Sequence, residues 1–157
     1  MKVLLALIVA VLASLSYLPA FSADKASAAA DGDPSTAWVT KRFKGWPNFG
    51  NLPNRKDGSG VVIDLGSAKD VSGVQVSMYR PGQTAEILAA APSASNPASL
   101  SDFPQRIATS SKAGDKLTVK LDKPVKTQYV LIHITALPSD GESGWFRGGI
   151  SDVKVTG

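Results

Sequence analysis

The stretch that decides the fold is TQYVLIHITAL, residues 127–137. Val130, Ile132 and Ile134 fall on one side of an extended chain there, and the other side holds Tyr129, Leu131, His133 and Thr135. Alternation with a period of two predicts a half-buried strand. The same pattern recurs, separated by Gly and Pro turns, in residues 36–40, 61–65, 71–79, 85–90, 106–109, 116–121 and 150–155. Short strands at this spacing favour an antiparallel β-sandwich, so we predict an all-β chain with one such domain.

Composition narrows the chemistry. The chain has 157 residues, a net charge of +4, no cysteine and one histidine, His133. This excludes disulfides, thiolate metal sites, cysteine nucleophiles and a zinc site with several histidines. His133 lies in the register opposite Val130 and Ile132, on the outer face of its strand, where a structural or solvated role is expected. Since the sequence also lacks a nucleophile elbow, a phosphate loop and a dinucleotide fingerprint, we predict that the protein is not an enzyme.

Residues 1–22, MKVLLALIVAVLASLSYLPAFS, read as an export segment. Lys2 precedes an uncharged apolar run over residues 3–13, and small residues follow Pro19. This pattern is typical of a signal peptide, with an uncleaved membrane anchor as the alternative. We therefore predict that residues 1–22 lie outside the fold and that residues 23–157 form the domain. Removal of Lys2 lowers the net charge from +4 to +3. The domain is expected to be secreted or extracytoplasmic, in a bacterial cell envelope.

Residues 31–38, DGDPSTAW, match the DGDxxTxW signature of the discoidin-like family, also known as coagulation factor 5/8 type C or galactose-binding-like domains. Residues 60–65 (GVVIDL), 128–136 (QYVLIHITA) and 148–157 (GGISDVKVTG) resemble strands of that family. In its individual residues the sequence is similar to the C-terminal extracytoplasmic domain of actinobacterial lipid II flippase-type membrane proteins. The resemblance covers residues 27–157 and implies a jelly-roll β-sandwich in which Trp38 plugs the core.

The resemblance also implies a structural calcium ion. Its ligands would come from Asp31, Asp33 and Thr36, with Asp152 where the family usually has Glu, since hard oxygen ligands suit calcium. In the alternative reading the aspartates only cap a turn. Family members usually carry a strand ahead of the signature, and here the export segment runs almost straight into the signature. Either the sandwich lacks a full first strand, residues 15–28 supply it, or the chain derives from a larger membrane protein.

The most distinctive surface stretch is residues 41–56, KRFKGWPNFGNLPNRK, with five basic residues, three aromatic residues and no acid. Aromatic faces stack on sugar rings, and Asn and Arg supply hydrogen bonds. We predict a ligand site at Trp46, Asn48 and Arg55, joined by Arg80 and, from the loop 138–149, by Trp145. In the alternative reading Phe43 and Phe49 pin the loop to the core and the charges are solvated. Arg147 is expected to pair with an acid.

Together these features predict a non-catalytic extracytoplasmic module that binds carbohydrate or a cell-envelope glycan. One alternative is a protein-interaction or accessory domain of a membrane or envelope assembly. Another is binding to an anionic lipid surface. Single-stranded nucleic acid is disfavoured as a partner, because the domain is expected to be exported and carries little net charge.

Overall fold

The computed structural model describes residues 3–4, 7–13, 28–33, 35–45, 47 and 58–157. These residues form strands joined by turns, with one short 3₁₀ helix, η1 (Leu100–Asp102). The strands are β1 (Val3–Leu4), β2 (Leu7–Ala13), β3 (Trp38–Val39), β4 (Phe43–Lys44), β5 (Ser59–Met78), β6 (Gln83–Ala89), β7 (Gln105–Ala113), β8 (Lys116–Ala136), β9 (Trp145–Phe146) and β10 (Gly149–Thr156). Within this part of the chain, no helix is long and apolar enough to cross a membrane.

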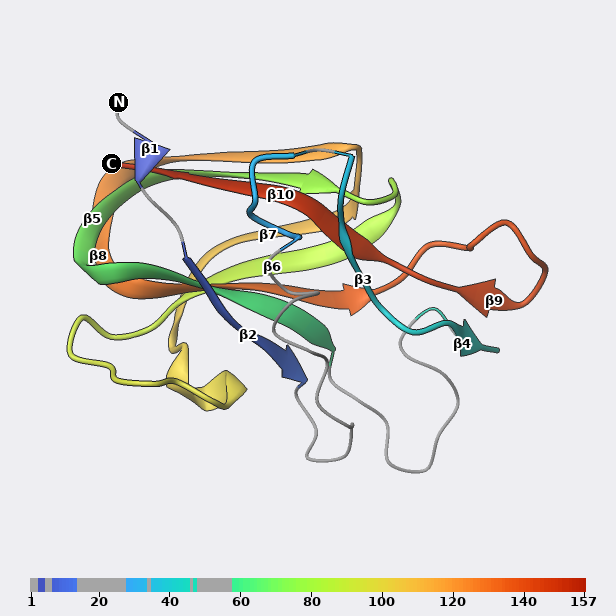
Figure 1. Cartoon of the computed structure of the whole chain (residues 1–157), viewed down its shortest axis with the longest axis horizontal. Helices are drawn as coiled ribbons and strands as arrows, with labels where there is room; N and C mark the ends of the chain where they lie inside the picture. The colour runs from blue at the N-terminus through green and yellow to red at the C-terminus, as the bar shows by residue number, and fades with distance from the viewer. Residues whose placement is uncertain (1–2, 5–6, 14–27, 34, 46, 48–57) are drawn as a thin grey trace.

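Two long strands, β5 and β8, shape the molecule (Figure 1). They pair antiparallel along their lengths, with a register shift between Asp64 and Lys69 where both bend from one layer into the other. One layer contains β1, β3, β10, the second half of β5 and the first half of β8. The other contains β2, the first half of β5, the second half of β8, β6 and β7. The predicted antiparallel β-sandwich is confirmed. The segments 61–65 and 71–79, expected as two strands, are joined in β5, and the segments 116–121 and 127–137 are joined in β8.

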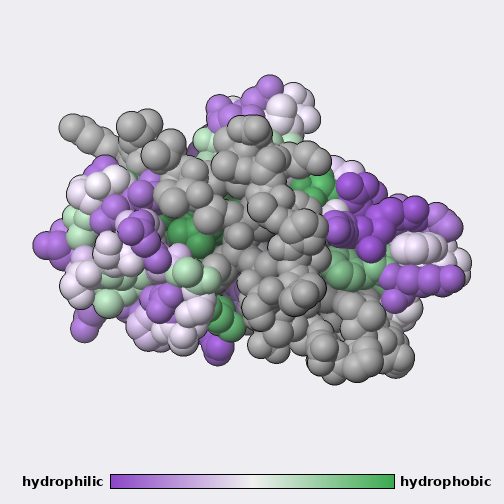
Figure 2. Space-filling model, turned by 60° about the horizontal axis from the view of Figure 1, so that its bottom comes forward, coloured by the Kyte–Doolittle hydropathy of each residue, from purple (hydrophilic) through white to green (hydrophobic). Residues whose placement is uncertain are grey.

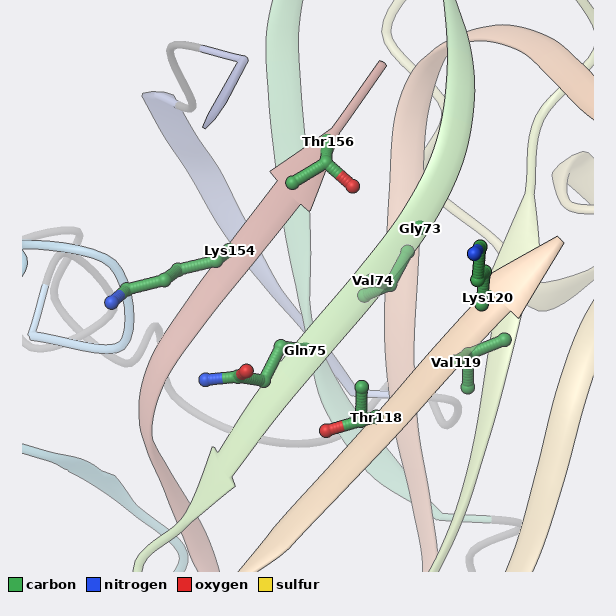
Figure 3. Close-up of a pocket in the computed structure, with 8 residues that line it drawn as sticks. All are labelled: Gly73, Val74, Gln75, Thr118, Val119, Lys120, Lys154 and Thr156. Carbon is green, nitrogen blue, oxygen red and sulfur yellow. The ribbon is translucent and has the colours of Figure 1, made fainter. Parts of the chain in front are cut away.

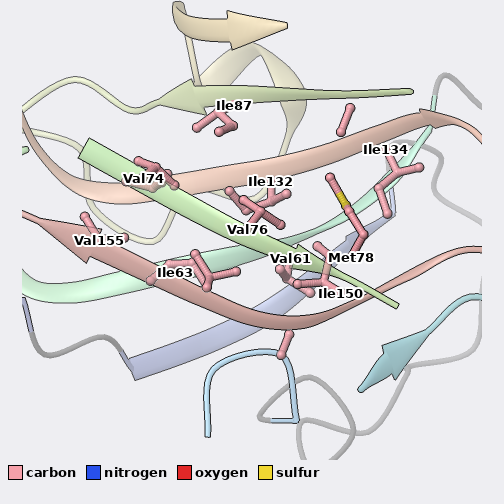
Figure 4. Close-up of a cluster of buried hydrophobic side chains, with 14 of the residues drawn as sticks. Val61, Ile63, Val74, Val76, Met78, Ile87, Ile132, Ile134, Ile150 and Val155 are labelled. Carbon is pink, nitrogen blue, oxygen red and sulfur yellow. The ribbon is translucent and has the colours of Figure 1, made fainter. Parts of the chain in front are cut away.

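The core lies between the two layers (Figure 4). Val130, Ile132 and Ile134 of β8 are fully buried, as their alternation predicts. Trp38 is only 1% exposed and packs in the same cluster, which confirms its role as a core plug. Its indole N–H is buried without a hydrogen-bond partner in the described structure. Apolar burial therefore holds Trp38 in place, against the cost of desolvating one donor.

A second apolar cluster covers the outer face of the layer that contains β6. Val62, Leu88 and Leu131 point outward from their strands, and Phe103 is buried against them. Phe103 follows η1, near the end of the connection between β6 and β7. That connection is largely exposed, but its Ala94 and Leu100 side chains pack on the cluster. The sheet is thus covered on both faces in this region.

His133 lies on the same outer face, in the register expected, but it is buried to 1% exposure. Its Nδ1 lies 2.9 Å from a carboxylate oxygen of Glu86 on the neighbouring strand β6. Glu86 also pairs with Arg106 at 3.1 Å. The solvated alternative for His133 is therefore wrong and the structural one holds. The Glu86 carboxylate pairs with Nδ1, whereas Nε2 is buried without a hydrogen-bond partner among the described residues.

The first residues of the chain are part of the sheet. Val3–Leu4 pair with the end of β10, and Leu7–Ala13 pair with Ser59–Asp64 of β5. Residues 3–4 and 7–13 thus lie in the sheet, and the expected domain boundary after residue 22 stays a prediction. The physical reason for the pairing is that the edges of β5 and β10 offer free backbone N–H and C=O groups, which an adjoining extended segment satisfies. Removal of the segment during export stays a prediction.

Candidate functional site

A small ribbon projects from one end of the sandwich (Figure 1). Strands β4 and β9 pair antiparallel there, with Phe43 opposite Phe146 and Lys44 opposite Trp145. Phe43 and Phe146 are partly buried against the core, while Arg42 and Lys44 on either side of Phe43 are exposed. This confirms the Phe43 half of the reading in which the basic loop is pinned to the core; Phe49 lies outside the described residues. Figure 2 shows hydrophilic side chains gathered at this end.

Backbone hydrogen bonds tie the basic loop to the loop between β8 and β9. The amide of Gly45 donates to the carbonyl of Gly144 at 2.8 Å, and the amide of Leu137 donates to the carbonyl of Pro47 at 2.6 Å. Gly45 has a φ of 97°, in the left-handed region that glycine adopts easily. Two segments about a hundred residues apart in sequence thus form one surface.

Arg42 is the centre of an ionic network on this surface. Its guanidinium donates to the carboxylates of Asp140 and Glu142, the latter at 2.5 Å. The hydrogen bond from Arg42 is the main reason why the pKa of Asp140 lies below its usual range, and the same bond raises the pKa of Arg42. The guanidinium carbon also lies 4.7 Å from the ring centroid of Trp145, with the Lys44 ammonium at 5.7 Å. Cation–π attraction and ion pairing together fix the indole.

Arg80 reaches the same surface from the turn after β5. One Nη1 hydrogen bond goes to the Ser139 carbonyl at 2.9 Å, and the guanidinium lies over the Tyr79 ring at 5.6 Å. The fully buried Gln83 holds this turn, since its amide donates to the carbonyls of Arg80 and Gly149, each at 2.9 Å. The amide of Gly149 donates back to Gln83 at 3.0 Å. Sequence reasoning missed Gln83, although a glutamine on the inward face of an apolar strand is a recognisable signal.

Arg147 has a structural role different in detail from the one expected. Its Nε donates to the Thr40 carbonyl at 3.0 Å, and in the described part of the chain it forms no ion pair. The Thr40 hydroxyl accepts from the Gly148 amide at 3.2 Å. Arg147 therefore joins the segment after β3 to the start of β10 through a backbone carbonyl oxygen.

The structure brings together only part of the predicted ligand set. Arg80 and Trp145 lie at this end of the sandwich, whereas Trp46, Asn48 and Arg55 lie outside the described residues and stay predictions. The structure adds four charged side chains that were not assigned to the ligand site: Arg42, Lys44, Asp140 and Glu142. The sequence signal for this ionic network is the contrast between two loops: residues 41–56 are basic without an acid, and residues 138–149 carry both Asp140 and Glu142. The arrangement offers fixed donors, acceptors and an aromatic surface.

Two of the predicted calcium ligands, Asp31 and Asp33, cap the turn ahead of β3. The carboxylate of Asp31 accepts from the Asp33 amide at 2.9 Å and from the Thr36 hydroxyl at 2.6 Å. The carboxylate of Asp33 accepts from the amide and the hydroxyl of Ser35, and these bonds lower the pKa of Asp33. Asp152 lies on β10 opposite Ser77. Across the described ranges no three acidic or histidine side chains form a group that could hold a metal. The capping alternative describes Asp31 and Asp33 in this structure, and the calcium site stays a prediction.

Comparison with known proteins agrees with the fold. A family model described as F5/8 type C domain matches residues 13–147. No curated protein sequence matches the chain. Similarity to the lipid II flippase-type domains stays a prediction.

Several solved structures are similar to the chain over nearly its whole length. Chitosan-binding module 2 of a chitosanase/glucanase from Paenibacillus sp. IK-5, solved with chitotriose, has a TM-score of 0.63 at 15% identity, with 94% of each chain covered. The family 32 carbohydrate-binding module of Clostridium perfringens NanJ, solved with galactose, has a TM-score of 0.56 at 21% identity, covering 93% of this chain and 90% of that one. The corresponding module of AlyQ, solved with 4,5-unsaturated mannuronic acid, has a TM-score of 0.56 at 20% identity, with 95% of each chain covered. At these identities the likeness concerns the fold.

Proposed function

Because the chain belongs to the F5/8 type C domain family, we propose that it is a non-catalytic module that recognises carbohydrate through the loops around the β4–β9 ribbon. The observation that carries the proposal is the meeting of Trp145, Arg80 and the Arg42 network at one end of the sandwich. The solved relatives with galactose, mannuronic acid and chitotriose support it, since they share the fold.

The proposed recognition uses three kinds of group. The Trp145 indole presents apolar surface to the C–H groups of a sugar ring. Arg80 has five N–H donors, of which one is used by Ser139, so others are left for sugar hydroxyls. Glu142, whose side chain is 63% exposed, supplies a carboxylate that accepts from hydroxyls. Since the ionic network already holds these groups, binding costs little side-chain entropy.

The proposed ligand is a glycan of the bacterial cell envelope, consistent with the predicted export of the domain. Trp46, Asn48 and Arg55 belong to the proposed site through the basic loop that runs from Arg42. The alternatives from the sequence are a protein partner in an envelope assembly and an anionic lipid surface, and the test below separates them from the proposal.

The test is a glycan array with the purified chain, followed by titration calorimetry with the best ligand. Trp145→Ala and Trp46→Ala are each expected to weaken binding about tenfold, the upper end for losing one aromatic contact. Trp145→Phe is expected to retain most of the affinity because it keeps a ring. Lys123→Ala, at an exposed position of β8, is the control and should bind normally.

A blank array and peptidoglycan panel would overturn the carbohydrate proposal. Co-purification of a defined membrane protein in that case would favour an accessory domain, and binding to anionic vesicles would favour the lipid alternative. Thermal unfolding of each variant shows whether a loss of binding follows from a loss of fold.

A further inference from the structure

A second polar surface lies far from the β4–β9 ribbon, on the outer face of the layer that contains β10. Nine positions on three adjacent strands face outward there in three rows, given by the strand register. The rows are Asp152–Ser77–Lys116, Lys154–Gln75–Thr118 and Thr156–Gly73–Lys120. We call these nine residues the basic sheet face. It carries three lysines and one acid, and no aromatic or large apolar side chain.

A recess of about 220 Å³ opens on the basic sheet face (Figure 3). Its floor is the backbone around Gly73, which has no side chain to fill the space. The other lining residues are Val74, Gln75, Thr118, Val119, Lys120, Lys154 and Thr156, so polar and charged side chains share the recess with apolar surface. Figure 3 shows Lys154, Gln75 and Thr118 extending to the same side of their strands. The recess is smaller than the ~300–1,000 Å³ of pockets for drug-sized ligands, so it suits one unit of a polymer that runs across the sheet.

No ion pair among the described residues neutralises the lysines of the basic sheet face. Lys116, Lys120 and Lys154 are exposed, and none of them belongs to an ion pair in the described part of the chain. The one acid of the nine, Asp152, is only 6% exposed. Asp115 and Asp122 lie just outside residues 116–120, the part of β8 that belongs to the basic sheet face, and neither of them lines the recess. The exposed charged side chains that line the recess are both lysines, Lys120 and Lys154, so its rim attracts anions.

We propose that the basic sheet face is a second binding surface, specific for a polyanionic glycan that carries carboxylate or phosphate groups. The two lysines of the recess attract the anionic group, and Gln75, Thr118 and Thr156 hydrogen-bond to neighbouring hydroxyls. Without an aromatic side chain the recess has no ring to stack on a neutral sugar. Charge therefore decides which polymer binds.

This surface is separate from the proposed ribbon site. The residues of β10 in the recess, Lys154 and Thr156, come five to seven residues after Gly149, where the strand leaves the ribbon end. At ~3.4 Å per residue the two surfaces are roughly 17–24 Å apart along the strand. A glycan bound at the ribbon and a polyanion bound on the sheet can therefore be held at once, and simultaneous engagement would raise the overall affinity.

The test uses the full chain and two immobilised polyanions, polygalacturonate for carboxylate and polyglycerol phosphate for phosphate, with dextran as the neutral polymer. We expect binding to at least one polyanion and none to dextran at this surface. The double variant Lys120→Ala/Lys154→Ala is expected to weaken polyanion binding about tenfold, since each exposed charge pair contributes little by itself. The variant Lys120→Arg/Lys154→Arg should keep it.

The matched control is Lys123→Ala/Lys126→Ala, which removes the same charge from exposed positions of β8 outside the recess. It should retain polyanion binding. Wild-type binding should also weaken between 0.1 M and 1 M salt, because the screening length falls from ~10 Å to ~3 Å. Gly73→Ala gives a second readout: its Cβ would lie 2.7 Å from the Thr156 hydroxyl and narrow the recess without a change in charge.

Equal loss of binding in the two double-lysine variants would overturn the proposal, because net charge rather than the recess would then explain the affinity. Binding to neither polyanion would overturn it as well. Neither result bears on the ribbon site, whose test depends on Trp145 and Trp46 with glycans of the array. The polymer that binds identifies the anionic group.

Discussion

Replacing Trp38 with alanine tests whether the core between the two layers holds this domain together. Trp38 lies on β3 opposite Ile150 of β10 and is 1% exposed, so almost all of its side chain is removed from water. A buried aromatic side chain covers ~150–250 Å², which at ~25 cal/mol per Å² corresponds to about 4–6 kcal/mol as an upper estimate. The unpaired indole N–H subtracts roughly 1–3 kcal/mol from this.

The expected loss in Trp38→Ala includes the cavity left behind and is about 3–5 kcal/mol. Trp38→Phe keeps most of the ring and removes the unpaired N–H, so it should lie much closer to wild type, within roughly 1–1.5 kcal/mol. In a chain of 157 residues each kcal/mol corresponds to ~2–4 °C of melting temperature. Trp38→Ala should therefore melt roughly 6–20 °C below wild type.

The assay is urea unfolding followed by far-ultraviolet circular dichroism, because tryptophan fluorescence itself changes with the substitution. The slope of free energy against urea should stay the same in all three proteins, so that midpoints report stability. A Trp38→Ala midpoint equal to wild type would refute the assignment of Trp38 to the core. A Trp38→Phe variant as unstable as Trp38→Ala would show that the indole N–H has a partner.

Two other predictions concern the sheet and the ribbon. Gly60→Ala places a Cβ 2.0 Å from the backbone carbonyl oxygen of Ile132, so urea unfolding should show a loss of about 1–3 kcal/mol in the free energy of unfolding. Gly114→Ala is the control, because its Cβ would enter open space and the stability should barely change. Equal losses in the two variants would contradict the packing of β5 against β8. The pKa of Asp140 is lowered in the folded protein, so its ion pair with Arg42 stabilises above the unfolded pKa of ~3.9 and is lost as pH falls through the folded value. Asp140→Asn should accordingly be less stable than wild type at pH 7, with the difference shrinking as the pH is lowered below about 4; a difference in thermal stability that does not depend on pH would contradict the pairing.

Much of the fold could be predicted because it depends on local alternation. Val130, Ile132 and Ile134 are buried as their spacing predicts, and Trp38 fills the core as its signature suggests. What the alternation could not show was that strands separated by Gly66 are continuous. Gly66 has a φ of 79°, so it turns the chain within β5 instead of ending it. Sheet hydrogen bonds to β8 on both sides of the bend decide that outcome.

The candidate site was predictable only in part. The basic loop and the acidic loop are visible in the sequence, but their pairing is not, because Arg42 and Asp140 meet only through strand contacts between β4 and β9. The basic sheet face could not be predicted from the sequence for the same reason. Lys120 and Lys154 belong to different strands, and the register with β5 places them around Gly73.

The sequence by itself determined the class of the fold, since the period of its apolar residues requires extended strands with one buried face. It also excluded cysteine chemistry and histidine-rich metal sites by composition alone. Only the tertiary structure decided which charges meet, that His133 is buried against Glu86, and that the first residues of the chain pair with β5 and β10. The physical reason is that side-chain alternation is a property of each strand, whereas these contacts depend on the register and packing between strands distant in the chain.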